Sequence, residues 1–187
     1  MQKFIDIIKS ILKIKELKNR ILFTLGLLLV YRLGAQIVLP GIDSLELTAF
    51  NSRFDGGGLL GILNAFTGGA FGNASVFALG IMPYISASIV VQLMQVALPY
   101  LQKLQKERES GRKKITQLTR YGTVLLATVQ GYGVAVGIEN MSSQGMQAVM
   151  DPGLFFRVVT VITLVSGTLF LMWLGEQITQ RGIGNGI

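Results

Sequence analysis

Long runs of apolar residues with at most one charge alternate with polar and basic segments along this chain. Four of these runs, 21–39, 77–98, 121–138 and 154–174, approach membrane length, since about 20 apolar residues in a helix cross the hydrocarbon core of a bilayer. They are too long and too continuous for the strands of a membrane barrel, which need about 10 residues of alternating pattern. The pattern therefore predicts an all-α polytopic membrane protein.

The segment 1–20, before the first run, has helical spacing of its own. Lysines alternate with apolar residues that share one helical face: Phe4, Ile7, Ile8, Ile11 and Ile14. This predicts an amphipathic helix lying in the cytoplasmic interface. The apolar run that follows is too long for the core of a signal peptide, and no small-residue cleavage site ends it, so we expect the segment to be retained.

Lysine and arginine gather on one side of the expected spans. They crowd the segment 1–20 and the link 99–120, whereas the outer link 40–76 holds one arginine and the outer loop 139–153 holds none. Because positive loops stay in the cytoplasm, we expect a cytoplasmic N-terminus and a cytoplasmic turn at 175–187. The net charge of +7 is then explained by topology and lipid contact, and binding of nucleic acid such as ribosomal RNA is a weaker interpretation.

Composition limits the chemistry that the chain can perform. It contains no cysteine and no histidine, which excludes disulfides and thiolate catalysis and removes the commonest general base and metal ligand. The glycines at 182, 184 and 186 follow a G-x-G-x-G spacing, and no βαβ unit precedes them, so we reject a dinucleotide site. We expect no enzyme activity, no cofactor and no metal; only chemistry by a pair of carboxylates stays formally open.

A further apolar segment, LLGILNAFTGG at 59–69, lies within the outer link and has glycines at both ends. Its apolar side chains fall on one helical face: Leu59, Ile62, Leu63 and Phe66. The predicted helix is too short to span a membrane. It is either an interfacial or re-entrant cap, which the pattern slightly favours, or a movable element with permissive hinges.

The second span combines a proline with a polar stripe. Pro83 removes a backbone donor and restricts Met82, so the regular helix should begin near Pro83. One stripe at helical spacing comprises Ile81, Ile85, Ser88, Gln92 and Gln95. Polar groups at membrane depth face protein or a water-filled cavity. A kinked helix bonded to its neighbours and a pore-lining helix explain this pattern about equally well.

The third span carries small residues four positions apart, at Ala127, Gly131 and Ala135. Small residues at this spacing let helices approach closely. We interpret this repeat as a packing seam.

Several long motifs resemble the SecY family, the central subunits of the bacterial protein-conducting channel. They are VYRLGAQIVLPGID at 30–43, FTGGAFGNASVFALGI at 66–81, FALGIMPYISASIVVQL at 77–93, ESGRKKITQLTRYGT at 109–123 and MWLGEQITQRGIGNGI at 172–187. The resemblance covers nearly the whole chain, in order. It implies the N-terminal portion of the ten-helix SecY clamshell, with about four spans and the start of the fifth, in the bacterial cytoplasmic (inner) membrane.

The resemblance also implies roles for individual residues. The positions resembling a pore ring are Ile81, Ile85 and Ile187. Those resembling a plug are Leu59, Leu60, Gly61, Ile62, Leu63, Asn64, Ala65, Phe66, Thr67, Gly68 and Gly69. Those resembling a lateral gate are Ser86, Gln92 and Gln130.

The function implied by the resemblance is passage of unfolded secretory proteins and lateral release of transmembrane segments into lipid, without chemistry in this subunit. The implied partners are SecE, SecG, SecA, the ribosome, signal-peptide-bearing and nascent membrane proteins, and membrane lipids, with no small-molecule substrate. An ion or solute transporter is the alternative, since it too uses broken helices. It should carry charged midplane residues, and only Arg32 qualifies. An intramembrane enzyme would need an unusual base.

The charge asymmetry generates a test of topology. Single cysteines at Ser52 and Ser143 should react with an impermeant thiol reagent added outside intact cells, because the links that contain them are expected outside. Cysteines at Ser10 and Ser110 should react only from the cytoplasm. Labelling of Ser110→Cys from outside would contradict the four-span topology.

Overall fold

The computed structural model describes residues 14–43, 59–107, 109–142 and 149–186. The amphipathic segment expected before residue 14, and Ile187, lie outside these residues. The described helices are α2 (Lys15–Gly34), α4 (Leu59–Phe66), α5 (Met82–Ala97), α6 (Pro99–Lys106), α7 (Glu109–Ser142) and α8 (Leu154–Arg181). Within the described residues, β structure is limited to isolated bridges.

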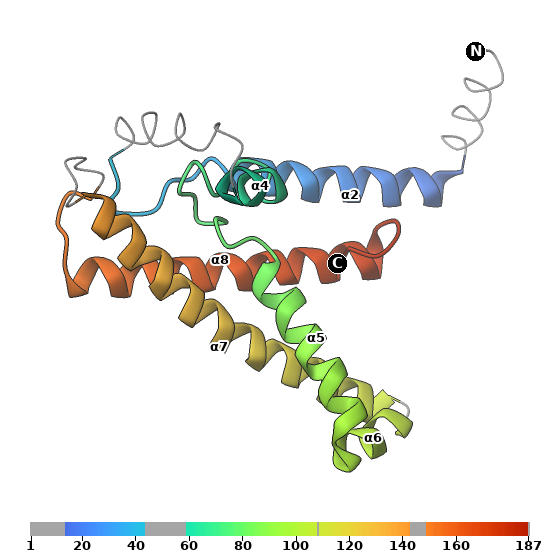
Figure 1. Cartoon of the computed structure of the whole chain (residues 1–187). Helices are drawn as coiled ribbons and strands as arrows, with labels where there is room; N and C mark the ends of the chain where they lie inside the picture. The colour runs from blue at the N-terminus through green and yellow to red at the C-terminus, as the bar shows by residue number, and fades with distance from the viewer. Residues whose placement is uncertain (1–13, 44–58, 108, 143–148, 187) are drawn as a thin grey trace.

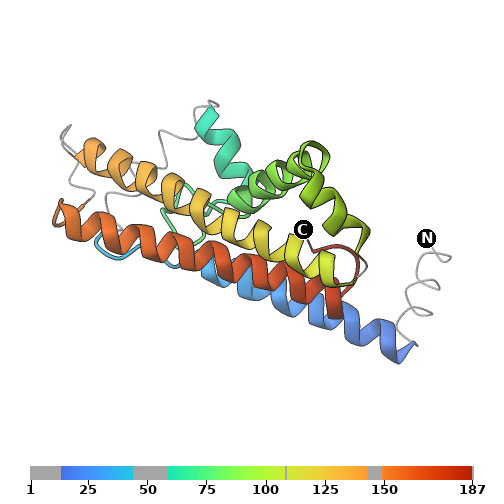
Figure 2. The same ribbon diagram turned by 90° about the horizontal axis from the view of Figure 1, so that it is seen from below.

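The long helices pack side by side, with α8 between α2 and α7 (Figures 1 and 2). Helix α8 runs antiparallel to both of these neighbours (Figure 1). Helix α5 packs against α7 and touches α8, and α6 packs against α5 and α7. The two ends of the bundle therefore differ: α2 begins at the end of the bundle where α8 finishes, and at the opposite end Ile42, after α2, forms a bridge with Val149, before α8 (Figure 1).

Helix α2 ends earlier than the apolar run 21–39 that predicts it. The α-carbon of Gly34 lies against the ring of Phe77, where a β-carbon would overlap the ring. Beyond Gly34 the chain pairs its backbone with a second segment: Val76 N–H donates to the carbonyl of Ile37 at 3.0 Å, and Leu39 N–H to that of Ala74 at 2.9 Å. The end of the expected first span is thus short bridge structure rather than helix.

The proline-containing helix α5 begins at Met82, next to Pro83, with Ile81 as its N-cap residue. This start agrees with the position that the proline predicts. The helix ends at Ala97, and the chain bends by 101° into α6. Pro99 occupies the first turn of α6, where its missing N–H costs nothing.

The basic link 99–120, expected as a loop, is largely helical on both sides of residue 108. Leu101 and Leu104 of α6 are buried, and α6 packs on the first turns of α7. Gly111 permits this approach, because a β-carbon there would overlap the carbonyl oxygen of Leu104. The burial of Leu101 and Leu104, three positions apart, accounts for a helix in a segment whose charge predicts a loop.

The seam between α7 and α8 confirms the interpretation of the small-residue repeat. Ala127 and Ala135 are buried, and a β-carbon on Gly131 would lie 3.7 Å from the side chain of Leu164. Leu164 itself is fully buried. At the far end of the seam, Arg157 Nε donates to Glu139 Oε2 at 2.6 Å, which joins the end of α7 to the first turn of α8.

Two described helices are long and apolar enough to cross a membrane, Glu109–Asn140 and Leu154–Arg181, or three spans if the bent pair of α5 and α6 counts as one. Both extend beyond the apolar runs that predict them, at 121–138 and 154–174. Helix α2 carries exposed apolar side chains along its length, namely Leu22, Leu25, Leu28, Leu29 and Leu33. The four-span topology stays a prediction.

The close packing of α8 generates a stability test. Gly167 lies against the carbonyl of Val76, where a β-carbon would overlap the oxygen. Gly167→Ala should therefore lower the free energy of unfolding of the purified complete protein in detergent by about 1–3 kcal/mol. Gly26→Ala is the matched control, because nothing lies within 4 Å of a β-carbon there and alanine favours a helix by roughly 0.5–1 kcal/mol. Equal thermal midpoints for the two variants would contradict this packing.

Candidate functional site

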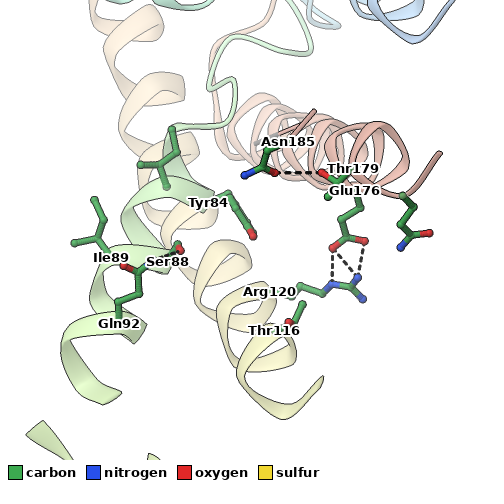
Figure 3. Close-up of a pocket in the computed structure, with 11 residues that line it drawn as sticks. Tyr84, Ser88, Ile89, Gln92, Thr116, Arg120, Glu176, Thr179 and Asn185 are labelled. Carbon is green, nitrogen blue, oxygen red and sulfur yellow. Dashed lines mark hydrogen bonds and ion pairs between the residues drawn. The ribbon is translucent and has the colours of Figure 1, made fainter. Parts of the chain in front are cut away.

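A hollow of about 610 Å³ lies between α5, the early part of α7 and the end of α8 (Figure 3). Its wall is formed by Tyr84, Ile85, Ser88, Ile89, Gln92, Thr116, Arg120, Glu176, Thr179, Gln180 and Asn185. The hollow mixes apolar, hydroxyl, amide and charged groups. Such a mixed surface on a helix of membrane character suits contact with water or protein better than contact with lipid.

Helix α5 contributes two kinds of side chain to this hollow. Ile85 and Ile89 are 45% and 52% exposed, so their branched apolar ends are available for contact. Gln92 Nε2 donates to Ser88 Oγ at 3.1 Å, one helical turn away, and this bond holds the amide along the helix (Figure 3). The polar stripe predicted from sequence therefore lines a hollow at Ile85, Ser88 and Gln92.

The opposite wall is joined by an ion pair between α7 and α8. Arg120 Nη2 donates to Glu176 Oε2 at 2.6 Å and to Oε1 at 2.7 Å, and Nε donates to Oε1 at 3.2 Å (Figure 3). The two side chains are 45% and 23% exposed, so solvent screens the pair and its net contribution should be no more than about 1 kcal/mol. Sequence reasoning missed this pair. The sequence feature that could have indicated this pair is the position of Glu176 just after the apolar run 154–174 and of Arg120 just before the run 121–138.

The glycine-rich turn after α8 completes the wall. The helix continues to Arg181, past the end of the expected span at 174. Gly186 N–H donates to Thr179 Oγ1 at 2.9 Å, and Ile183 N–H donates to Thr24 Oγ1 of α2 at 3.1 Å. A β-carbon on Gly186 would overlap the carbonyl oxygen of Gly175. The turn therefore folds back along α8, and only glycine fits where it does so.

Ile81 occupies a different environment from Ile85, one turn further along α5. It is half-buried and packs against a cluster formed by Ala35, Ala70, Phe77, Leu171 and Leu174. Of the three residues expected at the pore ring, Ile85 faces the hollow, Ile81 lies at the cluster beside it, and Ile187 is outside the described residues.

The three residues expected at a lateral gate do not share one surface. Gln92 lines the hollow. Ser86 is half-buried on α5 and Gln130 is exposed on α7, and neither belongs to the wall of the hollow.

The expected plug, 59–69, comprises α4 and the turn after it. Seen from below, α4 projects away from the layer of long helices (Figure 2). Its Ile62 side chain is 54% exposed. Among the described residues, no group of three or more aspartate, glutamate, histidine or cysteine side chains could hold a metal ion.

Comparisons with known proteins agree with this architecture. A sequence profile of the SecY family matches residues 75–187. Proteins named Protein translocase subunit SecY match at 56% identity from Rickettsia typhi, covering 91% of this chain, at 54% from Escherichia coli K12, covering 92%, and at 54% from Buchnera aphidicola, covering 92%. The chain spans 39%, 38% and 48% of the length of these relatives, respectively.

Solved structures show the same fold. A SecY structure, described by the role of its plug domain in stabilising the closed translocation channel, aligns with a TM-score of 0.59 at 18% identity, over 91% of this chain and 33% of that one. A protein-conducting channel aligns at 0.53 and 17% identity, over 90% of this chain and 34% of that one. Sec61 from a canine ribosome–channel complex aligns at 0.52 and 16%, with the same coverage.

The described part of the chain is mostly helical, two of its helices are long enough to cross a membrane, and it covers a portion of the protein-conducting channel fold. The molecule is therefore a helical, membrane-embedded protein with that fold. The chain belongs to the SecY family.

The ion pair of this site can be tested by a double-mutant cycle. Arg120→Gln and Glu176→Gln should each destabilise the complete protein, and the double variant should cost less than their sum, with a coupling of about 0.5–1 kcal/mol. High salt should reduce the coupling, because both side chains are partly exposed. The Arg20–Glu16 pair, 49% and 79% exposed, is the control and should couple less. Zero coupling between Arg120 and Glu176 in thermal unfolding would contradict a role in joining α7 to α8.

Proposed function

We propose that this chain forms part of the wall of a protein-conducting channel that passes unfolded secretory proteins across the bacterial cytoplasmic membrane. It would also release transmembrane segments sideways into lipid, and it would perform no chemistry itself. The hollow beside α5 carries this proposal, because it alternates exposed isoleucines with hydroxyl and amide groups. The shared name of the relatives, which describes a translocase subunit, supports it.

Isoleucine suits the seal of such a channel. A narrow apolar constriction excludes ions by dewetting, and β-branched side chains are stiff at χ1 and carry no hydrogen-bonding groups. Ile81, Ile85 and Ile187 form the ring in this proposal. Support comes from the position of Ile85 at the hollow and from the start of α5 at Met82, which sets Ile81 one turn above it.

The segment 59–69 acts as the plug in this proposal, and Ser86, Gln92 and Gln130 contribute to the lateral gate. A plug is an apolar segment that can leave its resting place. The exposed apolar side chain of Ile62 on α4 supports this role. Gln92 can exchange its bond to Ser88 for water or a neighbouring helix when a gate opens, so its amide need not stay unpaired in either state.

The partners we propose are SecE, SecG, SecA, the ribosome, client polypeptides and membrane lipids. Since no catalytic group is assigned to this chain, the energy for transport would come from the partners. The basic surface of α6 and early α7 would lie in the cytoplasm with the N-terminus, as the charge asymmetry predicts. The ribosome is supported by the complex in which one similar structure was solved.

The ring can be tested by single-channel recording of the reconstituted complete protein with its partner subunits. The double change Ile81→Ser and Ile85→Ser should raise the resting ion conductance several-fold, because hydroxyl groups let water enter the constriction. Deleting Leu59–Phe66 as well should raise it further, since plug and ring would seal in series.

The matched control is Val158→Ser with Ile162→Ser, one turn apart on α8. These side chains are 48% and 60% exposed and lie outside the wall of the hollow. Conductance should be unchanged in this control. Normal folding of the Ile81 and Ile85 variant without added conductance would remove both residues from the pore. Saturable uptake of a small solute by the wild type would favour a transporter instead.

A further inference from the structure

Among the described residues that line the hollow beside α5, Arg120 and Glu176 carry the only charges. The other lining side chains are apolar, hydroxyl, amide or phenolic. The basic residues in the first turns of α7, namely Arg112, Lys113 and Lys114, are exposed but do not belong to this wall. The net charge of the wall is therefore set by one arginine and one glutamate.

These two side chains neutralise each other. Both carboxylate oxygens of Glu176 accept from Arg120, Oε2 at 2.6 Å and Oε1 at 2.7 Å (Figure 3). A bidentate pair of this kind holds both groups in a fixed geometry. The side chains are 45% and 23% exposed, so a chain in the hollow could reach either group if its partner were removed. With the pair intact, the wall presents no net charge.

The polar groups around the pair also bond within the wall. Thr116 Oγ1 and Thr179 Oγ1 each donate to the backbone carbonyl one turn earlier in their helix, at 3.0 Å. On the facing helix α5, Gln92 Nε2 donates to Ser88 Oγ at 3.1 Å. A hydrogen bond to a passing chain would replace one of these bonds, so its net gain in free energy is small. The uncharged part of the wall therefore binds a passing chain weakly.

We infer that the Arg120–Glu176 pair keeps the hollow electrically neutral, so that the wall holds neither acidic nor basic stretches of a client polypeptide. The inference rests on the proposed function of the hollow as part of a path for polypeptides. An unpaired charge in a concave wall of low dielectric focuses its field on the space inside and attracts the opposite charge. Without Glu176, Arg120 would hold acidic stretches; without Arg120, Glu176 would hold basic ones.

The test measures the rate at which the reconstituted complete channel, with its partner subunits, transports three versions of one precursor. The versions differ in a short run of glutamate, lysine or glutamine within the mature region. The membrane potential is abolished with an ionophore, because it would itself act on charged segments. Each rate is divided by the rate of the glutamine version, so that a general loss of activity in a variant cancels.

The expected selectivity has opposite signs in the two single variants. Glu176→Gln should slow the glutamate version several-fold and leave the lysine version unchanged, and Arg120→Gln should do the reverse. The double variant should return to the wild-type ratios, because it removes both charges. High salt should weaken the selectivity of each single variant, since both positions are partly exposed. Either single variant is sufficient for the test if the other does not fold.

The matched control is the Arg157–Glu139 pair. It joins the same two helices at their other end, with an N–O distance of 2.6 Å, and lies outside the wall of the hollow. Glu139→Gln and Arg157→Gln should keep the wild-type ratios. If Glu176→Gln and Arg120→Gln slow the two charged versions equally or not at all, the pair only links α7 to α8 and the inference is wrong.

A crosslinking experiment separates failure of this inference from failure of the proposed function. The chain has no cysteine, so Ser88→Cys can be combined with a single cysteine in a precursor arrested during transport. A disulfide should form there, and none should form with Val158→Cys, outside the hollow. If Ser88→Cys forms no disulfide, the hollow is not on the path and the proposed function of this wall fails. If the disulfide forms while the single variants show no dependence on the sign of charge, the path stands and the neutralisation is wrong.

Discussion

The wedge of Phe77 between α2 and α8 is the contact on which the rest of the structure depends. Its ring fills the space that a side chain at position 34 would occupy and stacks on Tyr31 and Phe170 at once. Helices α2 and α8 are far apart in the chain. Phe77, from the segment between α4 and α5, contacts both of them and so joins them in one packed core. Its stacking on Tyr31 also fixes the direction in which the Tyr31 hydroxyl points.

Features set by local sequence could be predicted, and features set by tertiary contact could not. The start of α5 follows from Pro83, and the seam of α7 follows from small residues four positions apart. The end of α2 at Gly34 could not be predicted from the apolar pattern, because the residues after it remain apolar and leave the helix to pair with the distant segment 74–76. The sequence did not predict α6, because its short apolar face of Leu101 and Leu104 lies within a segment that is otherwise polar and basic.

The candidate site likewise has one part that local sequence predicts and one part that depends on tertiary contacts. The stripe on α5 follows from helical spacing alone, so the amino-acid sequence is enough to place Ile85, Ser88 and Gln92 together. Their opposite wall comes from α7 and α8, and the pairing of Arg120 with Glu176 depends on how those helices cross. A periodic pattern shows which residues of one helix share a face, but not which residues of another helix they meet.

The bond between Thr24 and Ile183 bears on how the molecule is made. It joins residues 159 positions apart, and contacts between distant positions form late because the intervening chain must be ordered first. During synthesis α2 would leave the ribosome long before its hydroxyl could meet the turn after α8. Until then Thr24 has only the carbonyl of Arg20, to which it also donates, at 2.9 Å. That local bond satisfies the Thr24 hydroxyl within an apolar helix, so α2 can form before the turn after α8 has been made.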